Sequence, residues 1–304
     1  MAAGVLLGLV APPLASLAQP LLVPTLMIPL ALALVRIDWR IVAAWRRRPA
    51  MLVPLQLWLL GASPVLVWAV TLALVPLGLP PALQQALVLM AASSPIVSSV
   101  AIALIVGLDA GLAIVAVLLS TALVPFTLPA MAAALIGVTL DMGAAALMLR
   151  LALLVGGAFA VAWAIRRCVG ADALARHRQT LDGFTVVNLV VFGVAIMDGV
   201  TAYAIDKPGY AMAALAAAYA FNLLLQACGY ALFIRLGRRA ALTVALVSGN
   251  CNMGLVLVAL QGHAPFAVTV FFALAQIPMY TLPALLAPLY RRALAPERGR
   301  EPAR

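Results

Sequence analysis

Apolar runs of about 20 residues follow one another along almost the whole chain, separated by short polar loops. A helix of this length matches the hydrocarbon thickness of a lipid bilayer. The runs are continuous rather than alternating in polarity, which is typical of membrane helices and unlike the strands of a membrane barrel. Because 66% of the residues are hydrophobic and only 9% are charged, we predict an all-α polytopic membrane protein.

The runs predict ten spans that form one membrane domain over residues 1–304, with no separate soluble module. Two halves of five spans each, residues 1–137 and 141–292, would have inverted topology because the number of spans per half is odd. A shift of 154 residues aligns Ser94 with Ser248 and residues 127–130 with 281–284. The expected spans are 3–17, 21–36, 51–76, 82–107, 110–137, 142–166, 182–204, 209–235, 240–261 and 265–290.

The basic residues predict the orientation of these spans. Of the 19 lysines and arginines, 17 lie in alternate loops and in the C-terminal tail, as the positive-inside rule requires of cytoplasmic segments. Both termini are therefore expected in the cytoplasm, although merging the two short first spans would move the N-terminus. The net charge of +10 is an orientation signal, not a nucleic-acid surface. The excess of arginine over lysine indicates a GC-rich bacterium and hence its inner (plasma) membrane.

Two spans contain residues that interrupt a helix. Span 9 carries VSGNCNMG at 247–254, and span 4 carries SSPIVSS at 93–99. Glycine, asparagine and proline all weaken a helix, and irregular backbone inside a bilayer is tolerated only where protein buries it or it lines a cavity. Two interrupted spans at matching positions indicate a transporter site, so we expect spans 4 and 9 to cross near mid-membrane. The alternative is a glycine-rich helix contact with asparagines bonded to a neighbour.

Few polar side chains lie deep in the spans, and those few are candidates for binding a substrate or a coupling ion. Asn222 and Gln226 are four residues apart and share one helix face. Asp198 could carry a proton or a cation, or reach water at the outer end of span 7. For each residue alone, a hydrogen bond that joins two helices is the alternative role. The candidate set is Ser94, Ser98, Ser99, Ser120, Thr121, Asp198, Asn222, Gln226, Ser248, Asn250, Asn252 and Gln276.

The sequence gives no support for catalysis. It contains no phosphate-binding loop, no nucleophile elbow and no histidine pair at metal-ligand spacing, and its three cysteines match no metal motif. We therefore expect no enzymatic activity and no cofactor, apart from Na⁺ or H⁺ as a coupling ion. The expected partners are the lipid bilayer and a small organic anion, with no nucleic acid and no required protein partner.

Asn252, Gly254 and Leu255 form an Asn-x-Gly-Leu motif, and the segment Leu104–Pro129 runs from span 4 into span 5. With the two broken spans, these features resemble the bile acid:sodium symporter family. The resemblance implies a core of spans 3–5 and 8–10 and a panel of spans 1, 2, 6 and 7, with the substrate between them.

The family's sodium ligands are poorly retained. Ser99 matches one ligand, and Gln56 is a candidate for the glutamine of span 3. Sodium prefers oxygen ligands, and most of the matched side chains offer no oxygen atom. We therefore expect the sodium sites to be incomplete, and the identity of the coupling ion stays undecided. The other matched positions hold Val100, Ala113, Val117, Val247 and Cys251.

The leading hypothesis is a secondary transporter of a small organic anion that works by alternating access, with its substrate near the crossing of spans 4 and 9. The N-terminal ends of two half-helices carry partial positive charge and would attract a carboxylate or sulfonate. The alternatives are an efflux carrier of a related family and a non-transporting membrane receptor or scaffold.

Overall fold

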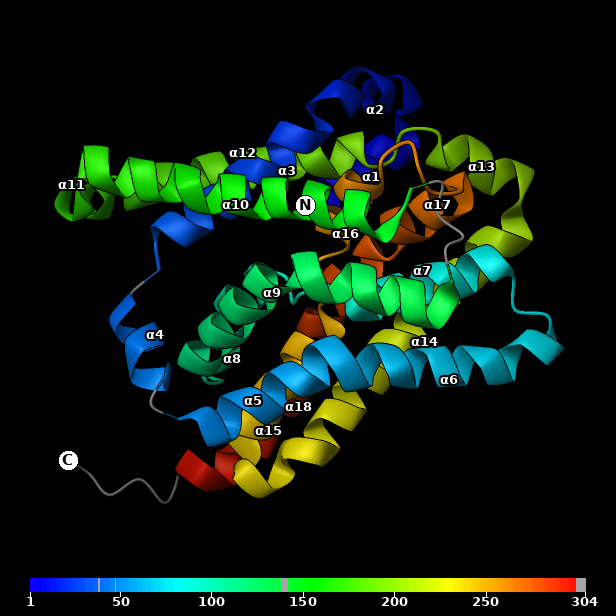
Figure 1. Ribbon diagram of the computed structural model, residues 1–304. Helices are drawn as coiled ribbons and strands as arrows, with labels where there is room; N and C mark the ends of the chain where they lie inside the picture. The colour runs from blue at the N-terminus through cyan, green and yellow to red at the C-terminus, as the bar shows by residue number, and fades with distance from the viewer. Residues whose placement is uncertain (38, 47, 138–141, 299–304) are drawn as a thin grey trace.

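The computed structural model describes residues 1–37, 39–46, 48–137 and 142–298, and these residues are helical nearly throughout (Figure 1). Large apolar side chains such as Leu17, Leu153 and Ile205 remain exposed, as lipid-facing residues do. The structure confirms an all-helical chain rich in helices of membrane length. In the described ranges, seven helical segments are long and apolar enough to cross a membrane: Pro12–Val35, Pro49–Leu77, Ala110–Ile136, Ala144–Val169, Gln179–Asp206, Pro208–Leu236 and Phe266–Leu294.

The N-terminal region differs from the predicted spans 3–17 and 21–36. The short helix α1 (Ala2–Val10) is followed by one long helix, Pro12–Val35, which comprises α2 (Pro12–Ala18), a 3₁₀ turn at Gln19–Leu21, and α3 (Leu22–Val35). Pro12 and Pro13 begin this helix, where a missing N–H is harmless, and the turn at Pro20 does not end it. Nine residues of helix rise only about 14 Å. The count of ten spans is therefore not confirmed. The prediction of a cytoplasmic N-terminus depended on that count, so it is not confirmed either.

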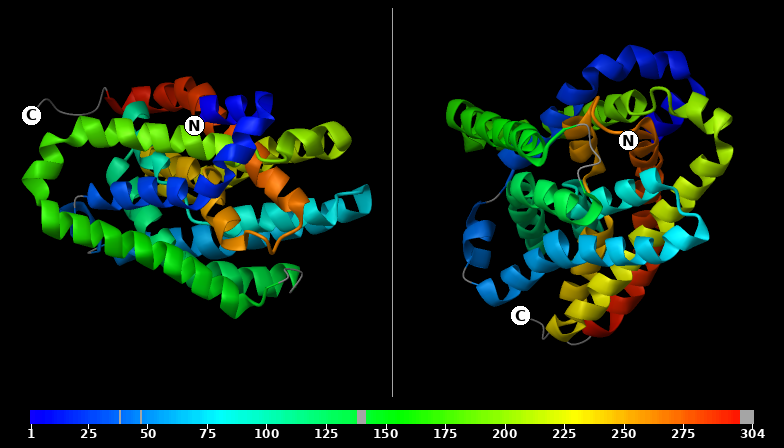
Figure 2. Two further views of the ribbon diagram at one scale, coloured as in Figure 1. Left: turned by 90° about the horizontal axis from the view of Figure 1, so that it is seen from above. Right: turned by 45° about the vertical axis from the view of Figure 1, so that its right-hand side comes forward.

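The helices form two layers, which we name the panel and the core (Figures 1 and 2). In the panel, α3 packs against both α10 (Ala144–Val169) and α12 (Arg178–Ala195), and α1 and α2 pack on α12. The core contains both broken helices, and its helices are α5 (Pro49–Leu57), α6 (Ser63–Leu74), α7 (Pro81–Ala92), α8 (Ser98–Val106), α9 (Ala110–Ile136), α14 (Pro208–Phe233), α15 (Arg238–Gly249), α16 (Met253–Leu260), α17 (Phe266–Leu274) and α18 (Gln276–Arg298).

The two predicted interruptions are confirmed. The chain leaves the helix between α7 and α8 and again between α15 and α16. Ser93 ends α7 in an extended conformation, and Pro95 has no N–H to continue the helix. Asn252 begins α16 by accepting a hydrogen bond from the Leu255 N–H at 3.3 Å, which is the usual role of an asparagine N-cap.

Glycine at 249 allows α14 and α15 to approach closely. A Cβ atom at this position would lie 2.5 Å from Asn222 Oδ1 and 2.9 Å from the Asn222 carbonyl oxygen. Gly249 is the last residue of α15 and has no left-handed backbone conformation. Its role is therefore to leave space for α14, rather than to break the helix as the sequence suggested.

We predict that Gly249→Ala will lower the free energy of unfolding by about 1–3 kcal/mol, because the added methyl group must displace the Asn222 backbone. Thermal unfolding of the purified protein in detergent measures the change. Gly156→Ala is the matched control, since a Cβ there meets nothing within 4 Å. Equal unfolding midpoints for the two variants would contradict close packing at Gly249.

Candidate functional site

Backbone hydrogen bonds join the two breaks directly. The Ile96 N–H donates to the Asn250 carbonyl at 2.8 Å, and the Asn252 N–H donates to the Ser94 carbonyl at 2.7 Å. Pro95 and Cys251 lie between these bonds as an antiparallel bridge. Each break thus supplies one donor and one acceptor to the other, which satisfies groups that would otherwise be unpaired at the centre of the protein.

A buried chain of amides holds α14 and α18 to the second break. Asn222 Nδ2 donates to the Gly249 carbonyl at 2.7 Å, and Asn222 Oδ1 accepts from Gln226 Nε2 at 2.6 Å. The Tyr290 hydroxyl donates to Gln226 Oε1. These side chains satisfy one another, so their geometry supports the structural role that was the alternative for each of them.

Ser248 and Gln276 are also satisfied by protein groups. Ser248 Oγ donates to the Val244 carbonyl at 2.7 Å and accepts from Trp58 Nε1 at 2.8 Å. Trp58 begins a π-helical turn, Trp58–Ala62, within the long helix Pro49–Leu77. Gln276 Nε2 donates to the carbonyl of Phe272 in the preceding turn at 3.0 Å. Ser248 therefore joins two core helices, whereas Gln276 bonds its own segment between α17 and α18.

A second group of buried polar atoms has no hydrogen-bond partner among the described residues. Its members are the hydroxyls of Ser94, Ser99 and Thr121 and the Oδ1 atom of Asn250. Ser94 and Asn250 lie in the two breaks, Ser99 is the second residue of α8, and all three are fully buried. Thr121 lies on the neighbouring helix α9. Because unpaired buried polar atoms are rare in native proteins, this cluster is the strongest candidate for contact with a ligand.

Two more predicted residues, Ser120 and Ser98, border this cluster. Ser120 Oγ donates to Gln56 Oε1 at 2.7 Å, which brings the glutamine of the first long core helix to α9. Gln56 Nε2 has no partner among the described residues. Ser98, at the start of α8, lies beside the hydroxyl of Tyr280 on α18. Gln56 and Tyr280 therefore belong near the candidate site, although neither was in the predicted set.

A crevice of about 330 Å³ lies between the panel and the core, and Thr121 is the member of this cluster that lines it. At its deep end lie Val97 and Thr121, and at its mouth lie Arg36 and Asp182. Arg36 forms an ion pair with Asp182, and its Nη2 donates to Thr185 Oγ1 at 3.3 Å. The walls are mostly apolar and come from Leu30, Ala33, Leu34 and Ile37 on the panel side and from Val100, Ala101, Leu104, Ala110, Ile114, Val117 and Leu118 on the core side.

The sequence contained a signal for the panel wall of the crevice. Leu30, Ala33, Leu34 and Ile37 follow the i, i+3, i+4, i+7 spacing of one helix face. Sequence reasoning assigned Arg36 only to orientation. Its place at the mouth depends on how the panel packs on the core, which the sequence does not specify.

Asp198 is not brought together with the other candidates. It lies between α12 and α13 (Val200–Asp206) and accepts a hydrogen bond from Ser16 Oγ at 2.6 Å. The ring of Phe192 packs over Gly254 beside the crossing, and Asp198 is six residues further along, which is about 9 Å of helix. The next residue, Gly199, faces Phe266 at the start of α17. Asp198 therefore connects panel helices near one end of the protein.

We predict effects of different size for two serine-to-alanine changes. Ser248→Ala should lower the free energy of unfolding by about 1–2 kcal/mol, because it leaves the buried Trp58 N–H without its acceptor. Ser99→Ala, the matched variant, should change it by less than about 0.5 kcal/mol, because its hydroxyl has no protein partner to lose. Denaturant or thermal unfolding in detergent compares them. A loss at Ser99 as large as at Ser248 would show that the Ser99 hydroxyl is structural.

The residues at the crossing offer hydroxyl and amide groups, and within the described ranges no three His, Cys, Asp or Glu side chains gather into a possible metal site. Neither a protein-family model nor a curated protein matches the chain. The resemblance to bile acid:sodium symporters therefore rests on the motifs and the broken spans alone, and function has to be inferred from the geometry of the site.

Proposed function

We propose that the protein is a secondary transporter of a small organic anion, similar to the bile acid:sodium symporters, and that it works by alternating access. The observation that carries the proposal is the crevice between panel and core, whose lining includes Arg36 and the unpaired hydroxyl of Thr121, next to the other unpaired hydroxyls of the candidate cluster. Its volume of about 330 Å³ is at the lower end of the range typical of small-molecule sites. A buried polar cluster beside an apolar crevice is a feature expected of a transport site for a small molecule.

The local charge at the crossing supports an anionic substrate. Both α8 and α16 begin there, at Ser98 and Met253, so two helix N-termini direct partial positive charge toward the centre of the protein. The hydroxyls of Ser99 and Thr121 can donate hydrogen bonds to a carboxylate or sulfonate oxygen.

The contacts beyond the crossing support alternating access. On that side the panel touches the core, since a Cβ at Gly254 would lie 2.8 Å from Phe192 and 3.2 Å from Leu26. Arg150 of α10 donates from Nη1 to the Gln261 carbonyl at 3.3 Å, just after α16. The crevice is open at the Arg36 end, beside a basic loop. We therefore propose that this conformation is open to the cytoplasm and closed to the outside.

The order of the core helices supports an inverted repeat. In each half, a long helix precedes a broken helix and another long segment follows it: Pro49–Leu77 and Ala110–Ile136 in the first half, Pro208–Leu236 and Phe266–Leu294 in the second. The reciprocal bonds at the crossing match Ser94 with Asn250 and Ile96 with Asn252, a shift of 156 residues rather than 154. We propose the two halves as repeats in a bacterial inner-membrane protein.

We propose that transport does not depend steeply on Na⁺. Ala113, Val117 and Val247 occupy positions where the resemblance implies sodium ligands, and all three are buried apolar residues. A hard cation prefers oxygen ligands, and these side chains offer none. H⁺ coupling and transport without coupling both remain compatible with the site.

Uptake of radiolabelled bile acids and smaller carboxylates into proteoliposomes tests the proposed function. We predict that Ala101→Trp abolishes uptake, because Ala101 lines the crevice and an indole would fill it. Ile105→Trp is the matched control on the same helix, since Ile105 is 72% exposed and outside the crevice. The Ile105→Trp control should take up substrate at the normal rate. Its uptake rate should change little when Na⁺ is replaced by K⁺.

Four outcomes of this experiment would contradict parts of the proposal. Equal uptake by both tryptophan variants would exclude the crevice as the route. Ligand binding without flux would favour a receptor or scaffold, and net export would favour an efflux carrier. Uptake that rises steeply with Na⁺ would show that a sodium site is built from other groups.

Cysteine labelling tests the topology. We predict that Arg176→Cys reacts only with reagent supplied from the cytoplasmic side and Lys207→Cys only from the opposite side, because the two positions lie in loops of opposite type. The native Cys168 is exposed and must first be replaced by alanine. Labelling of both positions from one side would contradict the orientation.

A further inference from the structure

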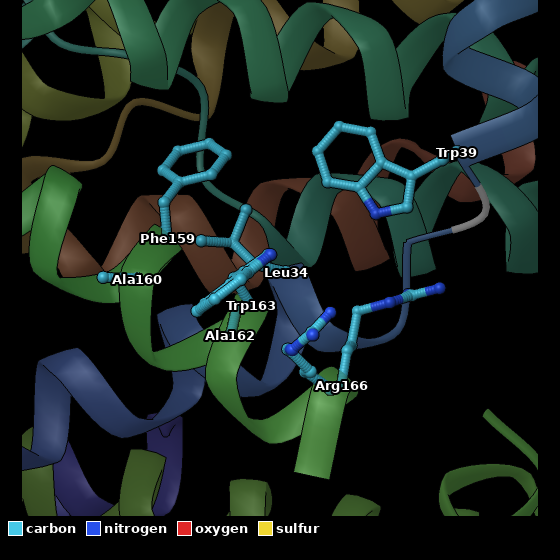
Figure 3. Close-up of a pocket in the computed structure, with 8 residues that line it drawn as sticks. Leu34, Trp39, Phe159, Ala160, Ala162, Trp163 and Arg166 are labelled. Atoms are coloured by element: carbon cyan, nitrogen blue, oxygen red, sulfur yellow. The ribbon is translucent and has the colours of Figure 1, made fainter. Parts of the chain in front are cut away.

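A second hollow, of about 610 Å³, lies where the end of α3 meets α10. Its walls are the end of α3, the start of α4 (Trp39–Arg46) and the last turns of α10. Leu34 lines both this groove and the crevice, so the two are neighbours at the end of α3. Figure 3 shows Trp39 facing Phe159 and Trp163 across the groove.

The groove lies where membrane helices end. The helices Pro12–Val35 and Ala144–Val169, both of membrane length, finish beside it. Trp39 and Trp163 are 46% and 66% exposed, whereas tryptophan side chains in soluble proteins are highly buried on average. Tryptophan collects at the boundary between hydrocarbon and water, where its ring is in contact with acyl chains and its N–H with polar groups.

Two arginines are held at the rim of this groove. Arg166 Nη1 donates to the Val35 carbonyl at 2.6 Å and the Ile37 carbonyl at 3.0 Å, which leaves the N–H groups of Nε and Nη2 for another partner. The Arg167 guanidinium lies 5.9 Å from the centre of the Trp163 ring, in a cation–π contact. Both cations are positioned by protein contacts that leave donors available to an anion.

We propose that this groove binds one anionic phospholipid, with its phosphate between Arg166 and Arg167 and an acyl chain along Leu34 and Phe159. The surrounding charge is complementary, because segments 36–48 and 166–178 together carry nine arginines and two aspartates. A free phosphate would use the arginines and leave the apolar wall without a partner. A phospholipid matches both features. The proposal depends on membrane embedding and not on transport.

Native mass spectrometry of the full-length protein tests the proposal after reconstitution in equal amounts of phosphatidylglycerol and phosphatidylcholine. We expect one retained phosphatidylglycerol per protein. Arg167→Gln should reduce its retention about tenfold, because it removes a hydrogen bond from a guanidinium to the charged phosphate. Arg176→Gln, which removes the same charge from an exposed position in the same basic loop, should leave retention unchanged.

A second variant tests the apolar wall without a change of charge. Ala160 is exposed and lines the groove, so Ala160→Trp should fill it and also reduce retention of phosphatidylglycerol. Equal losses in Arg167→Gln and Arg176→Gln would overturn the proposal, because they would indicate diffuse attraction. Equal retention of both lipids by the wild type, or normal retention by Ala160→Trp, would overturn it as well.

Discussion

Each backbone N–H and C=O group that leaves a helix inside a bilayer needs a partner, because hydrocarbon offers none. In this protein, the two breaks provide partners for one another through the bonds between Ile96 and Asn250 and between Asn252 and Ser94. The rest of the core is arranged around this pairing. The half-helices must approach at their broken ends, α14 must come close enough for Asn222 to bond the Gly249 carbonyl, and Gly249 must lack a side chain for that approach.

The same constraint divides the polar residues of the interior into two classes. Asn222, Gln226 and Ser248 are satisfied by protein groups and hold helices together. Ser99, Thr121 and Asn250 each keep a buried oxygen atom without a partner among the described residues. Burying a polar atom without a hydrogen-bond partner is unfavourable. A ligand that forms hydrogen bonds with these atoms would remove this cost, and a ligand that cannot form them would bind less tightly. This difference separates the framework of the core from its proposed binding surface.

Sequence reasoning predicted the helical membrane class and both interruptions, because the signals for these are local: hydropathy, glycine, proline and asparagine. It divided the N-terminal region wrongly, because Pro20 lies in a 3₁₀ turn that continues the helix instead of ending it. It placed the satisfied and the unsatisfied polar residues in one set, since a hydrogen bond such as that between Trp58 and Ser248 joins residues far apart in the chain. Arg36 and Asp182 at the crevice mouth were missed for the same reason: their proximity depends on tertiary packing.

Backbone pairing at the crossing also determines which residues each position accepts. The two bonds use main-chain atoms, so the side chains at 94, 96, 250 and 252 are not needed to form them. Proline at 96 or 252 would remove a donor, whereas Pro95 is compatible because its nitrogen is not one of the two donors. The centre of this protein can therefore accumulate side-chain substitutions while its scaffold persists. In evolutionary terms, ligand preference can diverge here without the invention of a new fold.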